Sequence, residues 1–206
     1  MAKSGTQQQP AKRADARRNV AAILDAALEC LTRNADASVA EIAQTAGVGR
    51  VTLYGHFPSR AELVDAVLTS AIEKGNQTLE AVDLSGDPRA ALDRLVTSSW
   101  LIVNQFRSLL LAAQAALPPG RIRELHEGPA ARVEGLITRG QVDGVFRDDL
   151  PTSWLVGTAQ NVMHGAADEI NAGRLDPDDA ATAISATLLA AFTPPGQPVP
   201  AVPASS

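Results

Sequence analysis

The segment 38–57 constrains the fold of this chain more than any other part of the sequence. It is SVAEIAQTAGVGRVTLYGHF, two short helical patterns separated by Gly47. Ser38, with Glu41 three residues later, is typical of a capping box at the start of a helix. Glycine adopts the left-handed backbone conformation without a Cβ clash, so Gly47 predicts a sharp turn. We therefore expect a helix, a tight turn and a second short helix.

A helix-turn-helix needs a small residue where the helices approach, a turn residue that tolerates positive φ, and an apolar anchor in the second helix. Ala43, Gly47 and Leu53 have these properties. Phe57 follows Leu53 by four residues and is expected to point inward beside it. The expected turn and core residues are thus Ala43, Gly47, Leu53 and Phe57.

The other positions of the second helix would face outward, where the first residues of a recognition helix contact base edges in DNA. Arg50 suits guanine, Val51 suits a thymine methyl group, and Gly49 permits close approach. Thr52, Tyr54 and His56 carry donors suited to phosphate oxygens. A helix N-terminus at Ser38 and the charge of Arg60 would add contacts. The predicted DNA-binding residues are Ser38, Gly49, Arg50, Val51, Thr52, Tyr54, His56 and Arg60.

Each of these residues also has an ordinary structural interpretation. Tyr54 could belong partly to the core, His56 could cap its own helix, and Arg50 could be a solvated charge. The combination is specific, because the turn glycine, two capping boxes (Ser38 with Glu41, Ser59 with Glu62) and an amphipathic preceding helix coincide.

The chain resembles the TetR (tetracycline-repressor-like) family of bacterial regulators along its first third. The resemblance covers the helical segment 18–31, the segment 39–57 and PSRAEL at 58–63. It implies that Thr52, Tyr54 and His56 hold the DNA backbone. This chain departs from the family pattern at Gly55, where the family often has a basic or bulky residue.

Charge is divided unevenly along the chain. Residues 1–60 carry eight Lys or Arg and five Asp or Glu, whereas residues 61–206 carry ten and eighteen. A basic head on an acidic body fits a nucleic-acid-binding module, although chance plus a basic tail would give the same pattern. The composition is 45% hydrophobic but only 3% aromatic, which favours helices over strands.

These patterns predict an all-α chain with two domains: an N-terminal three-helix helix-turn-helix domain and a larger helical domain for ligand binding and dimerisation. We expect a disordered arm at 1–15, the helix-turn-helix domain at 16–60, the effector-binding and dimerisation domain at 61–192, and a disordered tail at 193–206. A single cysteine, no signal peptide and no long apolar run favour a soluble, cytoplasmic protein.

Two C-terminal segments, 151–167 and 180–206, contain no Asp, Glu, Lys or Arg. Helices without charge must be buried on more than one face, and a second copy of the chain would supply the cover in a four-helix interface. The alternative is a central hairpin buried in a monomer. The predicted dimer contacts are Leu155, Val162, Ala166, Ala181, Ile184, Leu188 and Phe192.

The segment between Arg94 and Arg121 is apolar and contains one charge, Arg107. Apolar helices with a few polar groups suit a ligand cavity. The candidate ligand-binding residues are Trp100, Asn104, Phe106, Arg107, His126, Trp154, Asn161 and Met163. Arg107 could pair with an anionic ligand, but a side chain reaching water is the preferred interpretation. His164 is expected at the interface or in the core. The three histidines lack metal-ligand spacing, so no metal or cofactor is expected.

The sequence thus favours a ligand-responsive repressor that binds a near-palindromic double-stranded operator as a homodimer and is released by a small apolar or amphipathic effector. One alternative is a DNA-binding regulator without an effector. Another is a helical enzyme, for which the sequence offers no nucleophile elbow, phosphate loop or paired catalytic carboxylates.

Overall fold

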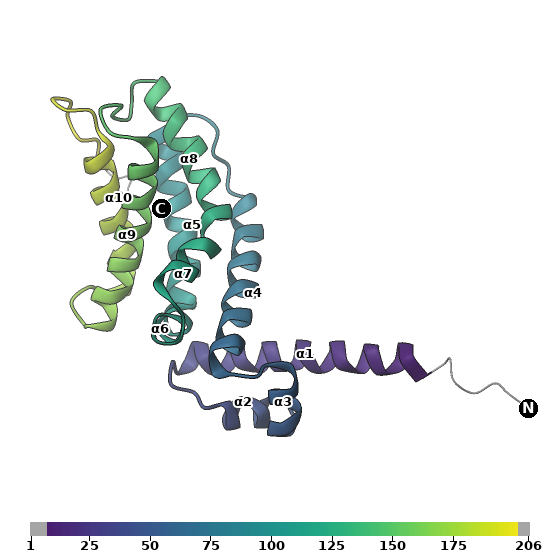
Figure 1. The fold of residues 1–206 in the computed structure, drawn as a ribbon. Coiled ribbons are helices and arrows are strands. Elements are labelled where there is room, and N and C mark those ends of the chain that lie inside the picture. Colours follow the sequence, from purple (N-terminus) through teal and green to yellow (C-terminus); the bar gives the residue numbers. More distant parts are fainter. Residues whose placement is uncertain (1–7, 202–206) are drawn as a thin grey trace, which may run out of the picture. The chain divides into compact units, whose positions relative to one another are not determined.

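The computed structural model describes residues 8–201, within which ten helices and no strand are present (Figure 1). The helices are α1 (Gln8–Arg33), α2 (Val39–Thr45), α3 (Arg50–His56), α4 (Arg60–Glu80), α5 (Pro88–Gln105), α6 (Arg107–Ala116), α7 (Pro119–Leu125), α8 (Glu127–Val142), α9 (Thr152–Asn171) and α10 (Pro177–Phe192). The expected all-α fold class is confirmed.

The first helix is longer than its apolar periodicity predicts. It begins at Gln8 rather than at Ala16. Gln, Ala, Lys and Arg all have high helix propensity, so a polar segment can extend a helix without adding an apolar stripe. Of the expected arm and tail, residues 1–7 and 202–206 lie outside the described residues. Residues 193–201 follow α10 without forming another helix.

Two compact units make up the described chain. The first extends to Ala71 and also includes Ser108–Ile122, whereas the second comprises Ile72–Arg107 and the residues from Arg123 onward. Helix α4 therefore contributes residues to both units. The functional boundary expected between residues 60 and 61 stays a prediction.

Helices α1, α2 and α3 of the first unit surround a small apolar core (Figure 1). Its fully buried side chains include Ile23, Leu31, Ile42, Leu53 and Leu63. The segment 108–122 is held to α4 within this unit by Arg121. The Arg121 guanidinium forms a two-pronged ion pair with Asp65, at 2.7 Å from Nε to Oδ1 and 3.1 Å from Nη2 to Oδ2.

Helices α5, α8, α9 and α10 of the second unit pack side by side around one hydrophobic core (Figure 1). Gly140 of α8 lies directly under the ring of Phe146, and a Cβ added there would lie 2.0 Å from the ring carbon Cδ2. Phe146 in turn contacts Phe192 edge to face, with ring centroids 5.9 Å apart. The loop after α8 is thus packed onto the end of α10.

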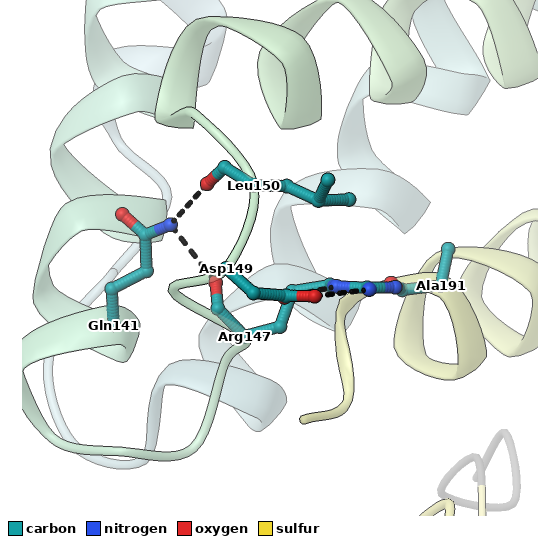
Figure 2. A network of polar contacts seen from close by, with 5 residues as sticks. All are labelled: Gln141, Arg147, Asp149, Leu150 and Ala191. Atoms are coloured by element: carbon teal, nitrogen blue, oxygen red, sulfur yellow. Dashed lines mark hydrogen bonds and ion pairs between the residues drawn. The ribbon is translucent and has the colours of Figure 1, made fainter. Parts of the chain in front are cut away.

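A polar network closes the same loop (Figure 2). The Arg147 amide donates to the carbonyl of Phe192 at 2.7 Å, and its guanidinium donates to Ala191 and to both carboxylate oxygens of Asp149. The Gln141 amide nitrogen donates to the carbonyls of Arg147 and Leu150 at 2.9 and 3.3 Å. These bonds hold the loop between α8 and α9 against the C-terminal end of α10.

The residues predicted to form a dimer interface lie instead in the core of this chain's own second unit. Leu155, Ala166, Ile184, Leu188 and Phe192 are buried there, and the half-buried Val162 and Ala181 pack against the same core. The five buried residues are thus covered by the chain itself, and the predicted dimer contacts of Val162 and Ala181 stay a prediction. The charge-free helices α9 and α10 pack on α5 and α8 through one side. Their outer sides expose uncharged residues that are not among the seven predicted contacts: Trp154, Asn161, Ala186, Thr187 and Ala190.

Within residues 8–201, no helix combines the length and apolar character that a membrane crossing requires. No group of three or more His, Cys, Asp or Glu side chains converges in this range as a metal site would need.

Candidate nucleic-acid interface and ligand cavity

The turn between α2 and α3 has the geometry that Gly47 predicts. Its φ is +67°, in the left-handed region that favours glycine. The Val48 amide donates to the carbonyl of Ala43 at 3.0 Å, and the Gly47 amide donates to that of Gln44 at 3.1 Å. This pair of bonds is a Schellman motif, which ends α2 and reverses the chain before α3 begins.

The Ser38–Glu41 capping box is complete. The Glu41 amide donates to the Ser38 hydroxyl at 3.2 Å, and the Ser38 amide donates to the Glu41 carboxylate at 2.7 Å. The Ser38 amide, and secondarily the Ser38 hydroxyl, lower the pKa of the Glu41 carboxyl below its ordinary value of 4.5. At the expected second box, the Glu62 amide donates to the Ser59 hydroxyl at 3.1 Å, while the Glu62 carboxylate accepts from that hydroxyl.

Helix α3 has one buried side and one solvent-exposed side. Leu53 is 1% exposed and packs inward, as predicted, beside the buried Ala43 of α2. Val51 is 88% exposed and Tyr54 47% exposed. Gly49, Arg50 and Thr52 are also exposed, whereas His56 and Phe57 are half-buried. The outer face of α3, which we define as Gly49, Arg50, Val51, Thr52 and Tyr54, is thus free to meet a partner.

The guanidinium of Arg60, expected to face DNA, binds main-chain carbonyl groups of its own chain. Its guanidinium donates to the carbonyl of Ala35 at 2.6 Å and to that of Ala37. Both carbonyls belong to the loop between α1 and α2. Arg60 therefore fixes this loop to the start of α4, and its predicted role as a direct DNA contact stays a prediction.

A cavity of about 170 Å³ lies within the second unit. Its walls come from the C-terminal part of α4 and from α5, α8, α9 and α10. Most of the lining is apolar, formed by side chains such as Ile72, Leu79, Leu95, Ile102, Val133, Ala159, Met163 and Leu188.

Two of the eight predicted ligand-binding residues, His126 and Met163, line this cavity. The other six do not line it, and their predicted role in ligand binding stays a prediction. Trp100 is 2% exposed in the core, Trp154 is 65% exposed on the surface, and Asn161 is also exposed. The half-buried residues Asn104, Phe106 and Arg107 are not among the cavity's lining. Arg107 donates to the Asn104 side-chain oxygen at 3.3 Å.

The sequence reasoning missed the contribution of α4 and the role of His164. Ile72, Gly75 and Leu79 are spaced by three and four residues, so they form one stripe of α4 that a search for small and apolar residues would have found. His164 lines the cavity too, and its ring meets that of His126 edge to face, with centroids 5.4 Å apart.

The electrostatic state of His164 follows from these surroundings. Burial lowers the pKa of His164 below 6.5, and the neighbouring His126 lowers it further, whereas Asp168 acts in the opposite direction. The His164 imidazole is therefore neutral at neutral pH. Its buried Nδ1 has no hydrogen-bond partner among the described residues.

Three comparisons relate the chain to known bacterial regulators. Residues 23–67 match the sequence model of the bacterial regulatory proteins of the tetR family. The HTH-type transcriptional repressor LfrR of Mycolicibacterium smegmatis is 40% identical over 78 residues, which span 37% of this chain and 41% of the repressor. The crystal structure of the TetR-like regulator LfrR from Mycobacterium smegmatis with proflavine is 26% identical, covers 84% of this chain and 94% of that chain, and has a TM-score of 0.63.

The chain thus resembles the tetR family of bacterial regulatory proteins, most specifically in residues 23–67. A family member from Agrobacterium tumefaciens shares its fold, with a TM-score of 0.68 and 18% identity over 86% of this chain and 99% of that one. The regulator FadR from Bacillus subtilis, solved with stearoyl-CoA, also shares the fold, with a TM-score of 0.67 and 17% identity over 82% and 96% of the two chains. The sequence-derived resemblance is thus confirmed.

Proposed function

We propose that this chain is a DNA-binding transcription regulator whose outer face of α3 reads duplex DNA. The observation that carries the proposal is the exposure of Arg50, Val51 and Tyr54 opposite the buried Leu53, directly after the Gly47 turn. The matched family segment contains this entire element.

Each group on this face has a chemical role in DNA binding. The Arg50 guanidinium can donate two hydrogen bonds to guanine, and the exposed Val51 can contact a thymine methyl group. Thr52, Tyr54 and His56 carry donors for phosphate oxygens, which fix the register of the helix on the duplex. The Ser38 hydroxyl and amide are occupied by Glu41, so Ser38 contributes mainly by holding the start of α2.

The regulator acts as a homodimer, so that two α3 helices meet two half-sites of a near-palindromic operator. The outer sides of α9 and α10 support this proposal, because Trp154, Asn161, Ala186 and Ala190 are exposed there without any intervening charge. Exposed aromatic side chains and surfaces depleted of charge are typical of an interface. Binding to chromosomal DNA would place the protein in the cytoplasm.

A small molecule in the cavity of the second unit controls DNA binding. The cavity and its largely apolar lining support this proposal, as does the likeness to LfrR, which was solved with proflavine. Ligand binding would favour a dimer state whose α3 helices are wrongly spaced for the operator, so the regulator would act as a repressor. No catalytic step is part of this function.

A mobility-shift experiment tests the function. The protein should shift a fragment from the region upstream of its own gene, at about 0.1 M salt and in the presence of unrelated competitor DNA. Tyr54→Phe removes the hydroxyl but keeps the ring, and should weaken this shift about fivefold or more. An absent shift would refute the function, and a shift that Tyr54→Phe leaves unchanged would refute the assigned face. Binding that no cavity ligand releases would instead favour a regulator without an effector.

A further inference from the structure

The charges around the cavity in the second unit limit what it can hold. Among the described residues that line it, the polar ones are Asn76, Ser99, His126, Arg132, Gln160 and His164, and none carries a carboxylate. A cationic ligand buried there would therefore lack the opposite charge that compensates its loss of water.

Arg132 is the one permanent charge in that lining, and it is already hydrogen-bonded to the main chain. Its guanidinium donates to the carbonyl of Leu79 at the end of α4 and, at 2.9 Å, to that of Val82. The two N–H groups used in this way are not directed at a buried anion. The positive charge nevertheless adds to the cost of placing a cation in the cavity.

His164 offers the cavity a neutral imidazole. It lies on α9 next to Met163, lines the cavity, and meets the ring of His126 edge to face. A polar group in an apolar lining is costly unless it is hydrogen-bonded, and a ligand group that bonds to it recovers that cost. A hydroxyl both donates and accepts, so it suits either tautomer of a neutral imidazole.

Volume limits the size of the ligand. An apolar cavity of roughly 150 Å³ accommodates a molecule the size of benzene. The cavity of about 170 Å³ therefore fits a ligand of one ring or two fused rings better than a long acyl chain.

We infer that the cavity selects a compact, uncharged and mainly apolar molecule that carries one hydroxyl or similar group, which bonds to His164. This inference rests on the proposed function, since it names the class of ligand that the regulator would sense. It concerns direct binding, however, and is tested without DNA.

Four probes with the same ring system separate the possibilities: naphthalene, 2-naphthol, 2-naphthoate and 2-naphthyltrimethylammonium. Equilibrium dialysis against the full chain at neutral pH measures their dissociation constants. We expect 2-naphthol to bind about three- to tenfold more tightly than naphthalene, which is the range of one hydrogen bond. Both charged probes should bind at least tenfold more weakly than 2-naphthol.

Variants locate the binding. His164→Leu should remove the preference for 2-naphthol over naphthalene, whereas Thr97→Ala, at an exposed position of α5 outside the lining, should keep it. Ala159→Phe should fill the cavity and abolish binding of every probe. The ranking of the probes on the unmodified protein tests the inference even where a variant fails to fold.

Tight binding of either charged probe would overturn the inference, as would the absence of binding by all four to folded protein. An unchanged preference for 2-naphthol in His164→Leu would also overturn it. The proposed function fails separately if the protein binds 2-naphthol in dialysis but does not shift DNA in the mobility-shift experiment.

Discussion

Gly140 is a position in the second unit where the packing leaves no room for a side chain. Its missing Cβ would lie 2.0 Å from the ring of the buried Phe146. We expect Gly140→Ala to lower the free energy of unfolding by about 1–3 kcal/mol, because the ring or the helix must move. Urea unfolding measures the change.

Gly135 on the same helix provides the matched control. It is exposed, and an added Cβ would have no neighbour within 4 Å. Gly135→Ala should raise the free energy of unfolding by up to about 1 kcal/mol through helix propensity. Equal effects of the two substitutions would contradict the close approach of Phe146 to Gly140.

Arg60 shows how a basic residue near the candidate DNA surface can have a structural role. Because its guanidinium binds two carbonyls of the loop before α2, Arg60→Ala should lower the free energy of unfolding by about 1–3 kcal/mol. The salt dependence of DNA binding should keep its slope, since no phosphate contact is lost. A slope reduced by about one unit, without loss of stability, would make Arg60 a phosphate contact instead.

At the scale of elements, the helix-turn-helix depends on the left-handed conformation of Gly47. Gly47→Ala should destabilise the protein by about 1–2 kcal/mol, because its φ is +67°. Gly55→Ala in α3 is the control, as its Cβ would point into open space at a helical position. Thermal unfolding compares them, and a Gly47→Ala protein as stable as the Gly55→Ala protein would contradict this account of the turn.

The position of His164 in helix α9, beside the cavity, predicts that the free energy of unfolding depends on pH. The pKa of His164 is below 6.5, first because of burial and then because of His126, with Asp168 opposing. As the pH falls through 6.5, His164 is protonated in the unfolded chain before it is protonated in the folded chain, because its folded-state pKa is lower. The free energy of unfolding is therefore unaffected by His164 protonation well above pH 6.5 and declines below it. Urea unfolding should therefore show a smaller decline towards acid in His164→Leu than in the unmodified protein or in Thr97→Ala. Parallel declines in all three would contradict a lowered pKa.

Local patterns predicted the elements well where the signal is contained in a few neighbouring residues. Ser38 with Glu41, Gly47 and Leu53 all have the predicted roles, because capping and turn chemistry depend on sequence neighbours. The start of α1 was predicted wrongly, since helix propensity extends a helix beyond its apolar stripe.

At the scale of the whole molecule, we expect a dimer that forms through the outer sides of α9 and α10. Ala186→Glu places a charge on this exposed, uncharged face and should convert the dimer to a monomer that binds the operator more weakly. Ala131→Glu, at an exposed alanine of α8, should leave the dimer intact. Sedimentation velocity and circular dichroism measure assembly and folding. A folded Ala186→Glu dimer would place the interface elsewhere.

Sequence reasoning was least successful where distant segments meet. The absence of charge in 151–167 predicted burial on more than one face, but not which side is covered by the chain's own α5 and α8. Trp154 and Ile184 have the same apolar character in the sequence, yet Trp154 is exposed and Ile184 buried. His164 joins His126 in one cavity only because α9 packs beside the start of α8.

We expect the outer face of α3 to distinguish its operator from other DNA. Fluorescence anisotropy on labelled DNA from the region upstream of the gene, with unrelated DNA of equal length for comparison, tests it most directly. Arg50→Ala should weaken operator binding about tenfold or more and reduce the preference over unrelated DNA, since a bidentate base contact contributes about 1–3 kcal/mol of discrimination. Lys74→Ala, which removes an exposed charge from α4, should change both affinities less than about twofold. Equal weakening on both DNAs by Arg50→Ala, or none, would contradict the claim.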